Sequence, residues 1–498
     1  MGCGPRTVTI PGILHRRALE TPAALALDAL SYDELHAGAS RVAAQLRRRG
    51  IANGERLVLY AENSPAYVYA YLGGLRAGAV VVPANVLYRE ADLGRLIDDS
   101  DAIAIAHSRQ SRPFVQTERK VLGLEEIAAW AADPSVPADL EPLPSPQALA
   151  LLIYTSGTTG RAKGAMLTHD NLAAIASQVT TAWRWTSDDV LLLTLPLFHV
   201  HGLAAGLNGT LFAGGRALLR ERFDAADVAT ALRSGNVSMF FGVPTMYVRL
   251  LETAGDARFD RVRLFVSGSA ALAASIHEAF ERRFGVSILE RYGSTEFGFA
   301  LTNRYAGPRH AGTVGFPFPG VEVELRGTDG SPAGPGEVGE ILVSGPNVCA
   351  GYWRNDEATA AAFVVDERGK RWFRSGDLGR FDPEIGYSIA GRIKELIISG
   401  GFNVYPLEVE DELLRIAGIR AVAVVGKPDA ARGELPVAFI EAEDIFDERE
   451  ALEILRTRLA SFKLPRELRR IDALPRNAMG KVDKPQLRAL LLAEPTAP

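Results

Sequence analysis

The segment Tyr154–Gly164, YTSGTTGRAKG, combines hydroxyl groups, glycines and cations in a pattern that suits a polyphosphate ligand. Glycines allow positive φ and bring successive backbone N–H groups close to an anion, while hydroxyls and the Lys163 ammonium add donors and charge. The apolar run before it, Ala148–Leu152, predicts a buried strand that holds the loop. An ordinary surface loop would need neither the lysine nor the strand. The predicted phosphate-binding residues are Thr155, Ser156, Gly157, Thr158, Thr159, Gly160 and Lys163. The G-x-x-x-x-G-K-[ST] order is absent, so a P-loop fold is not implied.

The composition predicts a soluble globular protein without a nucleic-acid or membrane partner. The chain has 498 residues, 47% of them hydrophobic and 23% charged, with a net charge of −5 and no dense basic cluster that would indicate nucleic acid. No apolar run approaches the roughly 18 residues of a membrane span, and two cysteines cannot form a disulfide framework. We therefore expect a cytoplasmic monomer or small homo-oligomer with no membrane partner.

Short apolar runs alternate with helical patterns, which predicts an α/β fold with parallel sheets. The expected strands include Leu57–Tyr60, Val80–Val82, Val190–Leu195, Met239–Gly242 and Leu264–Ser267. From Val321 onward, short strand-like segments divided by Gly and Pro predict a small β-rich subdomain. Two further strand-like runs, Ala421–Val425 and Pro436–Glu441, precede an amphipathic helix at about 447–460. We expect a large N-terminal domain, 1–393, that includes the β-rich subdomain at about 321–390. A small mobile α+β C-terminal domain, 394–498, follows it.

Four further blocks follow the phosphate loop: Glu290–Glu296 (ERYGSTE), Ser375–Asp377 (SGD), Gly391–Glu395 (GRIKE) and Pro475–Lys481 (PRNAMGK). In content and order, the five segments resemble the adenylate-forming acyl-CoA synthetases, relatives of firefly luciferase and of the adenylation domains of peptide synthetases. The resemblance implies a ligase that uses ATP, CoA and Mg²⁺. A carboxylate attacks the α-phosphorus of ATP, pyrophosphate departs, and the CoA thiolate then attacks the acyl-adenylate.

The resemblance also implies roles for individual residues. Thr295 and Glu296 would lie at the α-phosphate and the magnesium ion, with Thr155 as a second metal ligand. Asp377 would bind the ribose hydroxyls, since a carboxylate offers two oxygens to a vicinal diol. The remaining ATP-binding candidates are Gly268, Ser269, Ala270, Arg291, Tyr292, Gly293, Ser294 and Arg392.

The C-terminal blocks contribute three further functions by the same resemblance. Lys481 would be the catalytic cation that bridges the substrate carboxylate and the α-phosphate, and it also belongs to the ATP site. Lys394 matches the hinge about which the C-terminal domain swings. Gly400, Gly401 and Phe402 match the segment that lines the tunnel for the pantetheine arm of CoA.

Two arginines in the region of the acyl pocket indicate the kind of acid. Arg291 precedes Tyr-Gly in ERYGSTE, and Arg249 ends FGVPTMYVR. A buried arginine without a partner is costly, and a second substrate carboxylate would supply that partner with bidentate geometry. Internal pairs with Glu290 for Arg291 and with Glu252 for Arg249 are the alternative.

Several segments resemble the malonyl-CoA synthetase branch of the family: FGVPTMYVR, VSGSAAL, ERYGSTE and LPLFHVHGL. Within the last of these, His199 is a candidate to close over the acyl-adenylate and His201 to approach the substrate, together with Ser269. We therefore predict a malonate–CoA ligase, with methylmalonate as a further substrate. The alternatives are the same chemistry on another short or medium acid, a carrier-protein-loading adenylation enzyme, a luciferase-like oxygenase and a non-catalytic sensor.

Overall fold

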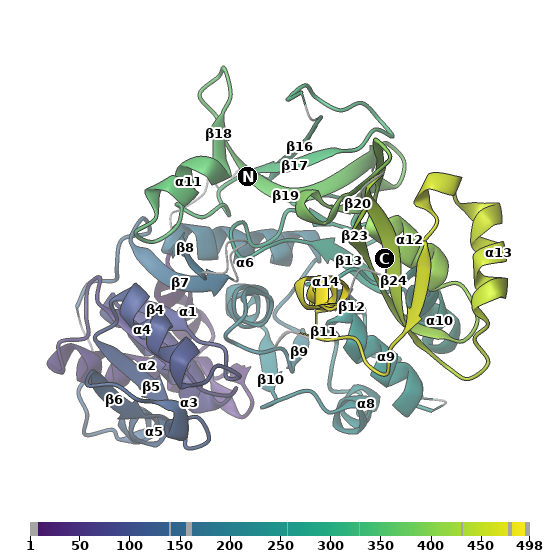
Figure 1. Ribbon diagram of the computed structural model, residues 1–498. Coiled ribbons are helices and arrows are strands. Elements are labelled where there is room, and N and C mark those ends of the chain that lie inside the picture. Colours follow the sequence, from purple (N-terminus) through teal and green to yellow (C-terminus); the bar gives the residue numbers. More distant parts are fainter. Residues whose placement is uncertain are drawn as a thin grey trace.

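The computed structural model describes residues 8–138, 141–155, 162–255, 257–327, 329–429, 432–476 and 481–493. These residues form four β-sheets with helices packed around them (Figure 1). The predicted α/β class with parallel sheets is confirmed, since most strand pairs in the two N-terminal sheets are parallel.

The first sheet has six strands and ends in the hairpin that carries the phosphate loop. Its strands, in spatial order, are β6 (Lys120–Gly123), β5 (Ala104–His107), β3 (Arg56–Tyr60), β4 (Val80–Pro83), β7 (Leu149–Thr155) and β8 (Lys163–Thr168). All neighbours are parallel except β7 and β8, which pair antiparallel. The apolar run predicted as a buried strand thus lies in β7, and the loop joins β7 to β8.

The second sheet has nine strands and provides the edge at which most of the site assembles. In spatial order they are β15 (Phe316–Pro317), β14 (Leu301–Thr302), β13 (Leu289–Tyr292), β12 (Leu264–Ser267), β11 (Met239–Gly242), β9 (Val190–Leu193), β10 (Arg216–Leu219), β1 (Leu25–Leu27) and β2 (Leu30–Ser31). Strands β11, β12 and β13 are fully buried, as expected for parallel strands covered on both faces. Strand β9 ends two residues earlier than predicted. Beyond its end, the side-chain amide of Asn63 donates a hydrogen bond to the carbonyl of Leu195 at 2.9 Å.

Helices cover both N-terminal sheets, and several of them begin with polar side chains that cap the free N–H groups. Ser31 and Thr168, for example, each form a capping box at a helix start. The helices of this part are α1 (Ile10–Glu20), α2 (Tyr32–Arg48), α3 (Pro65–Ala77), α4 (Glu90–Ser100), α5 (Leu124–Ala132), α6 (His169–Ala182), α7 (Asn208–Ala213), α8 (Ala225–Arg233), α9 (Pro244–Thr253) and α10 (Ala274–Phe284). A 3-10 turn, η1 (Arg112–Phe114), and a π-helix, η2 (His201–Leu207), complete them.

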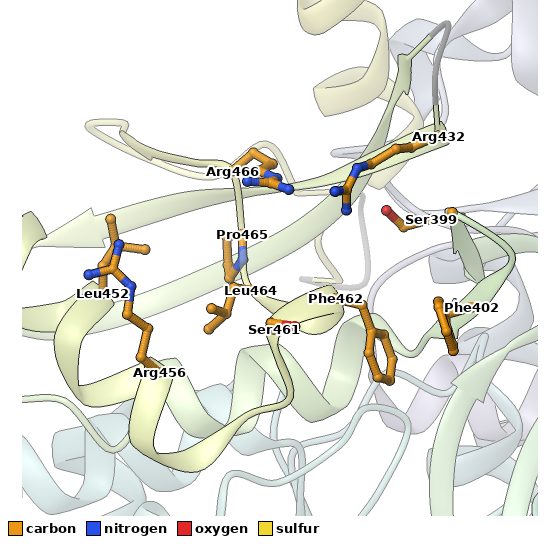
Figure 2. A pocket seen from close by; sticks show the side chains of 11 residues that line it. Ser399, Phe402, Arg432, Leu452, Arg456, Ser461, Phe462, Leu464, Pro465 and Arg466 are labelled. Carbon is orange, nitrogen blue, oxygen red and sulfur yellow. The ribbon is translucent and has the colours of Figure 1, made fainter.

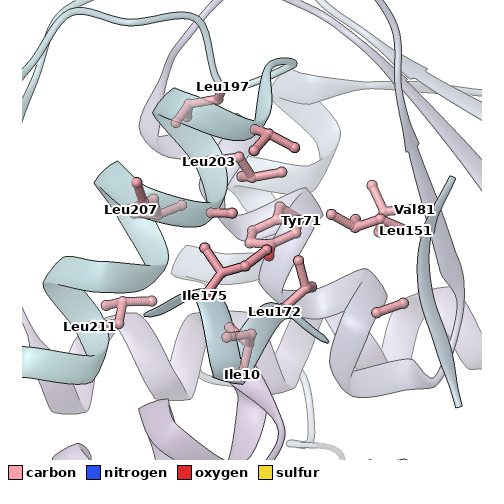
Figure 3. Close-up of a cluster of buried hydrophobic side chains, with 14 of the residues drawn as sticks. Ile10, Tyr71, Val81, Leu151, Leu172, Ile175, Leu197, Leu203, Leu207 and Leu211 are labelled. Carbon is pink, nitrogen blue, oxygen red and sulfur yellow. The ribbon is translucent and has the colours of Figure 1, made fainter. Parts of the chain in front are cut away.

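The largest hydrophobic core lies between the two N-terminal sheets. Figure 3 shows part of it, where Leu172 and Ile175 of α6 pack with leucines of η2 and α7 and with Tyr71 of α3. The Tyr71 hydroxyl is buried here and donates to Oδ1 of Asn208 at 3.2 Å. This core fixes η2, and therefore the histidine with which η2 begins.

The strand-like segments predicted from Val321 onward form a third, antiparallel sheet. It contains β16 (Glu322–Arg326), β17 (Gly339–Ser344), β18 (Phe363–Val365), β19 (Arg371–Asp382) and β20 (Gly386–Arg392), with α11 (Asp356–Ala362) beside it. Strands β19 and β20 pair Asp377 with Arg392 across the ladder. Two predicted nucleotide-binding residues are therefore neighbours at the end of this sheet.

The C-terminal part has its own sheet and its own apolar clusters. Its elements are η3 (Ile393–Glu395), β21 (Ile397–Ser399), β22 (Phe402–Val404), α12 (Pro406–Leu413), β23 (Ile419–Asp429), β24 (Gly433–Ala442), α13 (Glu448–Arg458), η4 (Ser461–Lys463), β25 (Glu467–Arg470) and α14 (Lys484–Ala493). Strands β23 and β24 and helix α13 correspond to the predicted strands and helix. Among the described helices, none combines the length and the apolar character needed to cross a bilayer.

Candidate active site

Four parallel strands of the nine-stranded sheet, β9, β11, β12 and β13, end at one edge, and the predicted residues follow them. His199 and His201 follow β9, Arg249 lies on the helix after β11, Ser269 follows β12, and the Glu296 segment follows β13. Ligand sites of open α/β sheets form at the carboxyl ends of the strands. The topology therefore gathers into one region residues that are up to about a hundred positions apart.

Thr155 and Glu296 meet at the phosphate loop. The Thr155 hydroxyl lies 3.4 Å from Glu296 Oε1, although 141 positions separate the two residues. Lys163 begins β8, and its ammonium lies 5.4 Å from the ring centroid of Tyr352. The predicted cradle residues Ser156, Gly157, Thr158, Thr159 and Gly160 lie outside the described residues.

Three hydroxyl groups surround the carboxylate of Glu296. Ser294 donates to Oε2 at 2.8 Å, and Tyr352 donates to Oε1 at 3.1 Å, on the same side as Thr155. Half-buried carboxylate and hydroxyl oxygens are the hard donors that Mg²⁺ prefers, and Mg²⁺ takes only one or two protein carboxylates. Among the described residues no group of three or more His, Cys, Asp or Glu side chains could hold a metal ion. The carboxylate of Glu296 and the neighbouring hydroxyl of Thr155 are donors that fit a magnesium ion.

The ERYGSTE segment follows β13 through a tight turn. A Cβ at Gly293 would lie 2.0 Å from the carbonyl oxygen of Gly298, so only glycine fits there. Thr295 is half-buried in the same turn. Sequence reasoning missed Tyr352, which lies far from any of the five blocks and has no local signal.

Asp377, Tyr292 and Arg392, three of the predicted ATP-binding residues, form a polar cluster in which Tyr292 is buried and Arg392 is exposed. Tyr292 donates its hydroxyl to Asp377 Oδ2 at 2.6 Å, and Arg392 Nε lies 3.1 Å from Oδ1. Burial raises the pKa of Asp377, while Arg392, Tyr292 and Lys481 oppose that rise. A carboxylate has about four acceptor positions, so both oxygens can still accept further hydrogen bonds.

Arg291 is 5% exposed and lacks an acidic partner among the described residues. Its guanidinium donates to the Ser269 hydroxyl at 3.3 Å and lies 4.4 Å from the ring centroid of Phe299, while its Nε has no partner. Burial lowers the pKa of Arg291 to about 9. Oε1 of the neighbouring Glu290 lies 3.3 Å from Nδ1 of His277 and not beside Arg291. The ion pair considered for Arg291 is therefore absent, and its charge is left uncompensated.

The backbone after β12 is shaped around Arg291. A Cβ at Gly268 would lie 2.3 Å from Nε of Arg291, so glycine is required for the guanidinium to pack there. Ser269 adopts a left-handed φ of 71°, which is uncommon for a residue other than glycine, and Ala270 is exposed. Such strain often accompanies functional sites, where the surrounding structure maintains it.

Arg249 differs from Arg291 in its surroundings. Helix α9 buries Tyr247 and Leu250, whereas Arg249 is exposed. Within the described part of the chain it forms no ion pair with Glu252 or with any other carboxylate. The structure therefore gives both arginines unpaired guanidinium groups but buries only Arg291.

His199 and His201 lie close to Arg291 and Lys481. The backbone N–H of His201 donates to His199 Nδ1 at 3.2 Å, and the His201 ring lies 5.9 Å from the ring centroids of both Phe241 and Phe299. Burial lowers the pKa of His199 to about 3, with Lys481 and Arg291 contributing. Burial also lowers the pKa of His201, and both of its ring nitrogens lack partners among the described residues.

Lys481 comes from the C-terminal part of the chain, shortly before helix α14, and its ammonium lies close to the charged residues of this site. Burial and the nearby Arg392 and Arg291 lower its pKa to about 8, while Asp377 and Glu296 act in the opposite direction. Lys394 lies in η3 with an exposed side chain, and partial desolvation, together with the nearby charges of Lys163 and Arg392, lowers its pKa. The structure therefore places Lys481 near Glu296 and near Arg291, the predicted metal-binding and acid-binding residues.

A separate cavity of about 780 Å³ lies in the C-terminal part, beside the predicted CoA segment (Figure 2). Gly400 and Gly401 form the β21–β22 turn with φ of 60° and 82°, and the Phe402 ring stacks on Phe462 at 4.7 Å. The lining residues are Ser399, Gly400, Phe402, Arg432, Leu452, Arg456, Ser461, Phe462, Leu464, Pro465 and Arg466. Sequence reasoning missed the three arginines because they come from separate elements and share no spacing.

Residues 14–353 match the family model of AMP-binding enzymes, and residues 408–481 match the model of the AMP-binding enzyme C-terminal domain. The chain therefore belongs to the AMP-binding enzyme family.

Curated relatives narrow the type of enzyme. A feruloyl-CoA synthase of Amycolatopsis is 36% identical, with 95% of this chain and 97% of the relative covered. A mitochondrial malonate–CoA ligase of Mus musculus is 34% identical, with coverage of 87% and 81%. A sulfoacetate–CoA ligase of Cupriavidus necator is 36% identical, with 92% of both chains covered. The chain is thus an AMP-forming acyl-CoA ligase, while the relatives act on different acids.

A solved structure supports the same conclusion. ATP-bound MatB from Rhodopseudomonas palustris is 37% identical and superposes with a TM-score of 0.89 over 97% of this chain and 99% of MatB. Apo MatB gives a TM-score of 0.80. ATP and CoA are accordingly the co-substrates.

Proposed function

We propose that the chain is an ATP-dependent malonate–CoA ligase, which converts malonate, ATP and CoA into malonyl-CoA, AMP and diphosphate through a malonyl-adenylate. Methylmalonate is a further substrate in this proposal, since one methyl group changes binding by only ~1–3 kcal/mol in a tailored pocket.

The observation that carries the proposal is the uncompensated charge of Arg291. Removing a guanidinium from water without a partner is unfavourable, and an arriving carboxylate offsets that cost through bidentate hydrogen bonds. The lowered pKa of Arg291, about 9, is the signature of this desolvation. An acid with a second anionic group next to the reacting carboxylate supplies what the pocket lacks. The ring of His201, whose nitrogens have no partner among the described residues, offers an additional donor.

The aromatic surroundings support a short acid over a long or aromatic one. Phe241 and Phe299 flank His201 at 5.9 Å, and Trp183 and Trp185 pack against Phe241 at 5.2 and 5.5 Å. In this proposal these rings limit the length of the acid that can lie beside His201. Malonate and sulfoacetate share the required chemistry, since each carries a second anionic group one carbon from its carboxylate.

In the first half-reaction a malonate oxygen attacks the α-phosphorus of ATP, a P–O bond forms, and the bond to diphosphate breaks. Lys481 stabilises the charge that develops between the carboxylate and the α-phosphate, and Asp377 holds the ribose. Glu296 and Thr155 would hold Mg²⁺, which neutralises phosphate charge when bound. The phosphate loop, Thr295 and Lys163 orient the phosphates, because phosphoryl-type transfer depends mostly on positioning and charge.

In the second half-reaction the CoA thiolate attacks the acyl carbon of the adenylate, and AMP leaves. We propose that the segment after Lys394 rotates between the two steps, with residues 394–498 moving as one domain relative to 1–393. The cavity lined by Arg432, Arg456 and Arg466 accepts the phosphates of CoA in this proposal, and Phe402 lies at its edge. Three guanidinium groups suit phosphate recognition.

Malonate is favoured over the acid of the feruloyl relative because ferulate has no second carboxylate for Arg291. A carrier-protein-loading enzyme remains the second candidate of the same chemistry, and it differs in using a protein thiol. A cytoplasmic location stays a prediction, since the malonate–CoA ligase of Mus musculus is described as mitochondrial.

The test measures AMP and diphosphate release, with and without CoA, on malonate, methylmalonate, sulfoacetate, ferulate, butyrate and octanoate. We expect malonate to give the highest kcat/KM and acyl-CoA formation to require free CoA. Formation of ADP would refute the mechanism, and a preference for ferulate or octanoate would refute the substrate.

A further inference from the structure

Lys484 begins helix α14, three residues after Lys481, and holds two carboxylates at once. Its ammonium lies 2.9 Å from Glu395 Oε2 and 2.8 Å from Glu410 Oε1. The Lys484 side chain is 17% exposed, and that of Glu410 is 11% exposed. A cation is unfavourable at a helix N-terminus, so this lysine does not serve the stability of α14 itself. The two carboxylates compensate for its position, and they raise its pKa.

The two carboxylates come from elements that define the start of the C-terminal part. Glu395 ends η3, the 3-10 turn that contains Lys394. Glu410 lies on α12, where its Oε1 also accepts the backbone N–H of Val424 at 2.7 Å. Lys484 therefore connects α14 to the hinge segment and to the C-terminal sheet through one side chain.

The backbone between Lys481 and Lys484 is also held. Val482 forms a β-bridge with Arg476, and the N–H of Asp483 donates to the carbonyl of Pro475 at 2.7 Å. Asp483 in turn accepts the N–H of Gln486 at 3.1 Å and caps α14. A displacement of Lys484 is therefore transmitted along a short, fixed backbone to Lys481.

We propose that Lys484 is a positioning residue, which through Glu395 and Glu410 sets the place of Lys481 against the phosphate site during adenylate formation. All three members of this ion-pair triad follow Lys394, so they move together when the C-terminal part rotates. The triad matters for rate only in the step in which Lys481 acts. The inference rests on the proposed role of Lys481 but not on the identity of the acid.

The experiment separates the two half-reactions. Adenylate formation is followed by malonate-dependent ATP–diphosphate exchange, and thioester formation by CoA consumption from supplied malonyl-adenylate. A displacement of a reacting group by about 1 Å can cost on the order of 100-fold in rate. We expect Lys484→Met to lower exchange by about 10- to 100-fold and thioester formation by less than about threefold.

Two further variants test the geometry rather than the fold. Lys484→Arg keeps the charge and both carboxylate contacts, so exchange should recover to within a few-fold of the unmodified enzyme. Glu395→Gln keeps the size and one hydrogen bond but removes a charge, and it should lower exchange selectively, by less than Lys484→Met. It also keeps the proposal testable if Lys484→Met fails to fold. The matched control is Lys427→Met, which breaks another C-terminal Lys–Glu pair, with Glu467 at 2.9 Å, and should leave both half-reactions unchanged.

Lys481→Ala provides the reference that keeps the two proposals distinguishable. If Lys481→Ala abolishes exchange while Lys484→Met and Glu395→Gln leave it unchanged, the positioning role is wrong and the role of Lys481 stands. Equal losses in both half-reactions for the Lys484 and Glu395 variants would also overturn it, because a general structural role would then account for them. If Lys481→Ala itself leaves exchange intact, the proposed role of Lys481 fails first and the positioning role fails with it.

Discussion

Replacement of Arg291 by alanine removes the one buried cation of the acid pocket that has no carboxylate partner among the described residues. If malonate binds there, its distal carboxylate becomes buried and unpaired in the variant. Breaking such a pair typically costs ~3–5 kcal/mol, and each ~1.4 kcal/mol is a factor of ten. We therefore expect kcat/KM for malonate to fall by roughly two to four orders of magnitude.

The same substitution should affect a monocarboxylate differently. Butyrate has no second charge, so the variant loses no attraction between residue 291 and this acid. The substitution also removes the free-energy cost of holding an unpaired guanidinium away from water. We expect butyrate activity to change little or to rise, and the KM for ATP to stay within a few-fold. The assay is AMP release on both acids for the unmodified enzyme, Arg291→Ala and Arg291→Lys. Lysine keeps the charge without the planar fork and should fall between the other two.

A stability measurement provides an independent check, because burying the unpaired cation of Arg291 costs free energy in the folded state. Arg291→Ala should not lower the Tm by the amount that loss of a buried ion pair would cause. Malonate should raise the Tm of the unmodified enzyme by mass action, and much less that of the variant. Parallel losses of malonate and butyrate activity, together with a large drop in Tm, would make Arg291 a structural residue and refute the reasoning.

Four further predictions follow from the site. Lys481→Ala should lower adenylate formation by roughly 10²–10³, the usual value of an electrostatic stabiliser, and spare thioester formation from supplied adenylate; equal losses would contradict the assigned role. Because Lys481 must be protonated to act and its pKa is lowered to about 8, kcat/KM for ATP should fall as pH rises through about 8, and Lys481→Ala should lose this limb of the profile. Lys394→Pro fixes φ near roughly −65°, so it should impair one half-reaction more than the other, and unchanged rates in both would remove the hinge. Arg466→Ala should raise the KM for CoA by about tenfold or more without affecting adenylate formation, while Arg458→Ala, whose side chain pairs with Glu412 outside the cavity lining, should change neither.

The sequence by itself determined the elements and the chemical class. Short apolar runs bounded by glycine and polar residues are a local signal, and β3, β4, β11 and β12 lie where that signal placed them. The five blocks predicted the adenylate-forming chemistry, because their content and order resemble those of the adenylate-forming acyl-CoA synthetases. Glycines also mark positions where another part of the chain comes close. At positions 268 and 293 an added Cβ would collide with neighbouring atoms, which is why both positions carry glycine.

Only the tertiary structure decided which of these residues meet and which remain unpaired. The pair of Tyr292 with Asp377 spans 85 positions, and the influence of Glu296 on the pKa of Lys481 depends on how the C-terminal part docks. Glu290 and Arg291 are neighbours on β13, so their side chains point to opposite faces of the sheet. The Glu290 side chain contacts His277 and that of Arg291 contacts Ser269, and no local sequence feature predicts which face each one takes. Whether a charged side chain has a partner is a property of everything packed around it. For that reason the uncompensated Arg291, the exposed Arg249 and the ion-pair triad of Lys484 emerged only from the folded molecule.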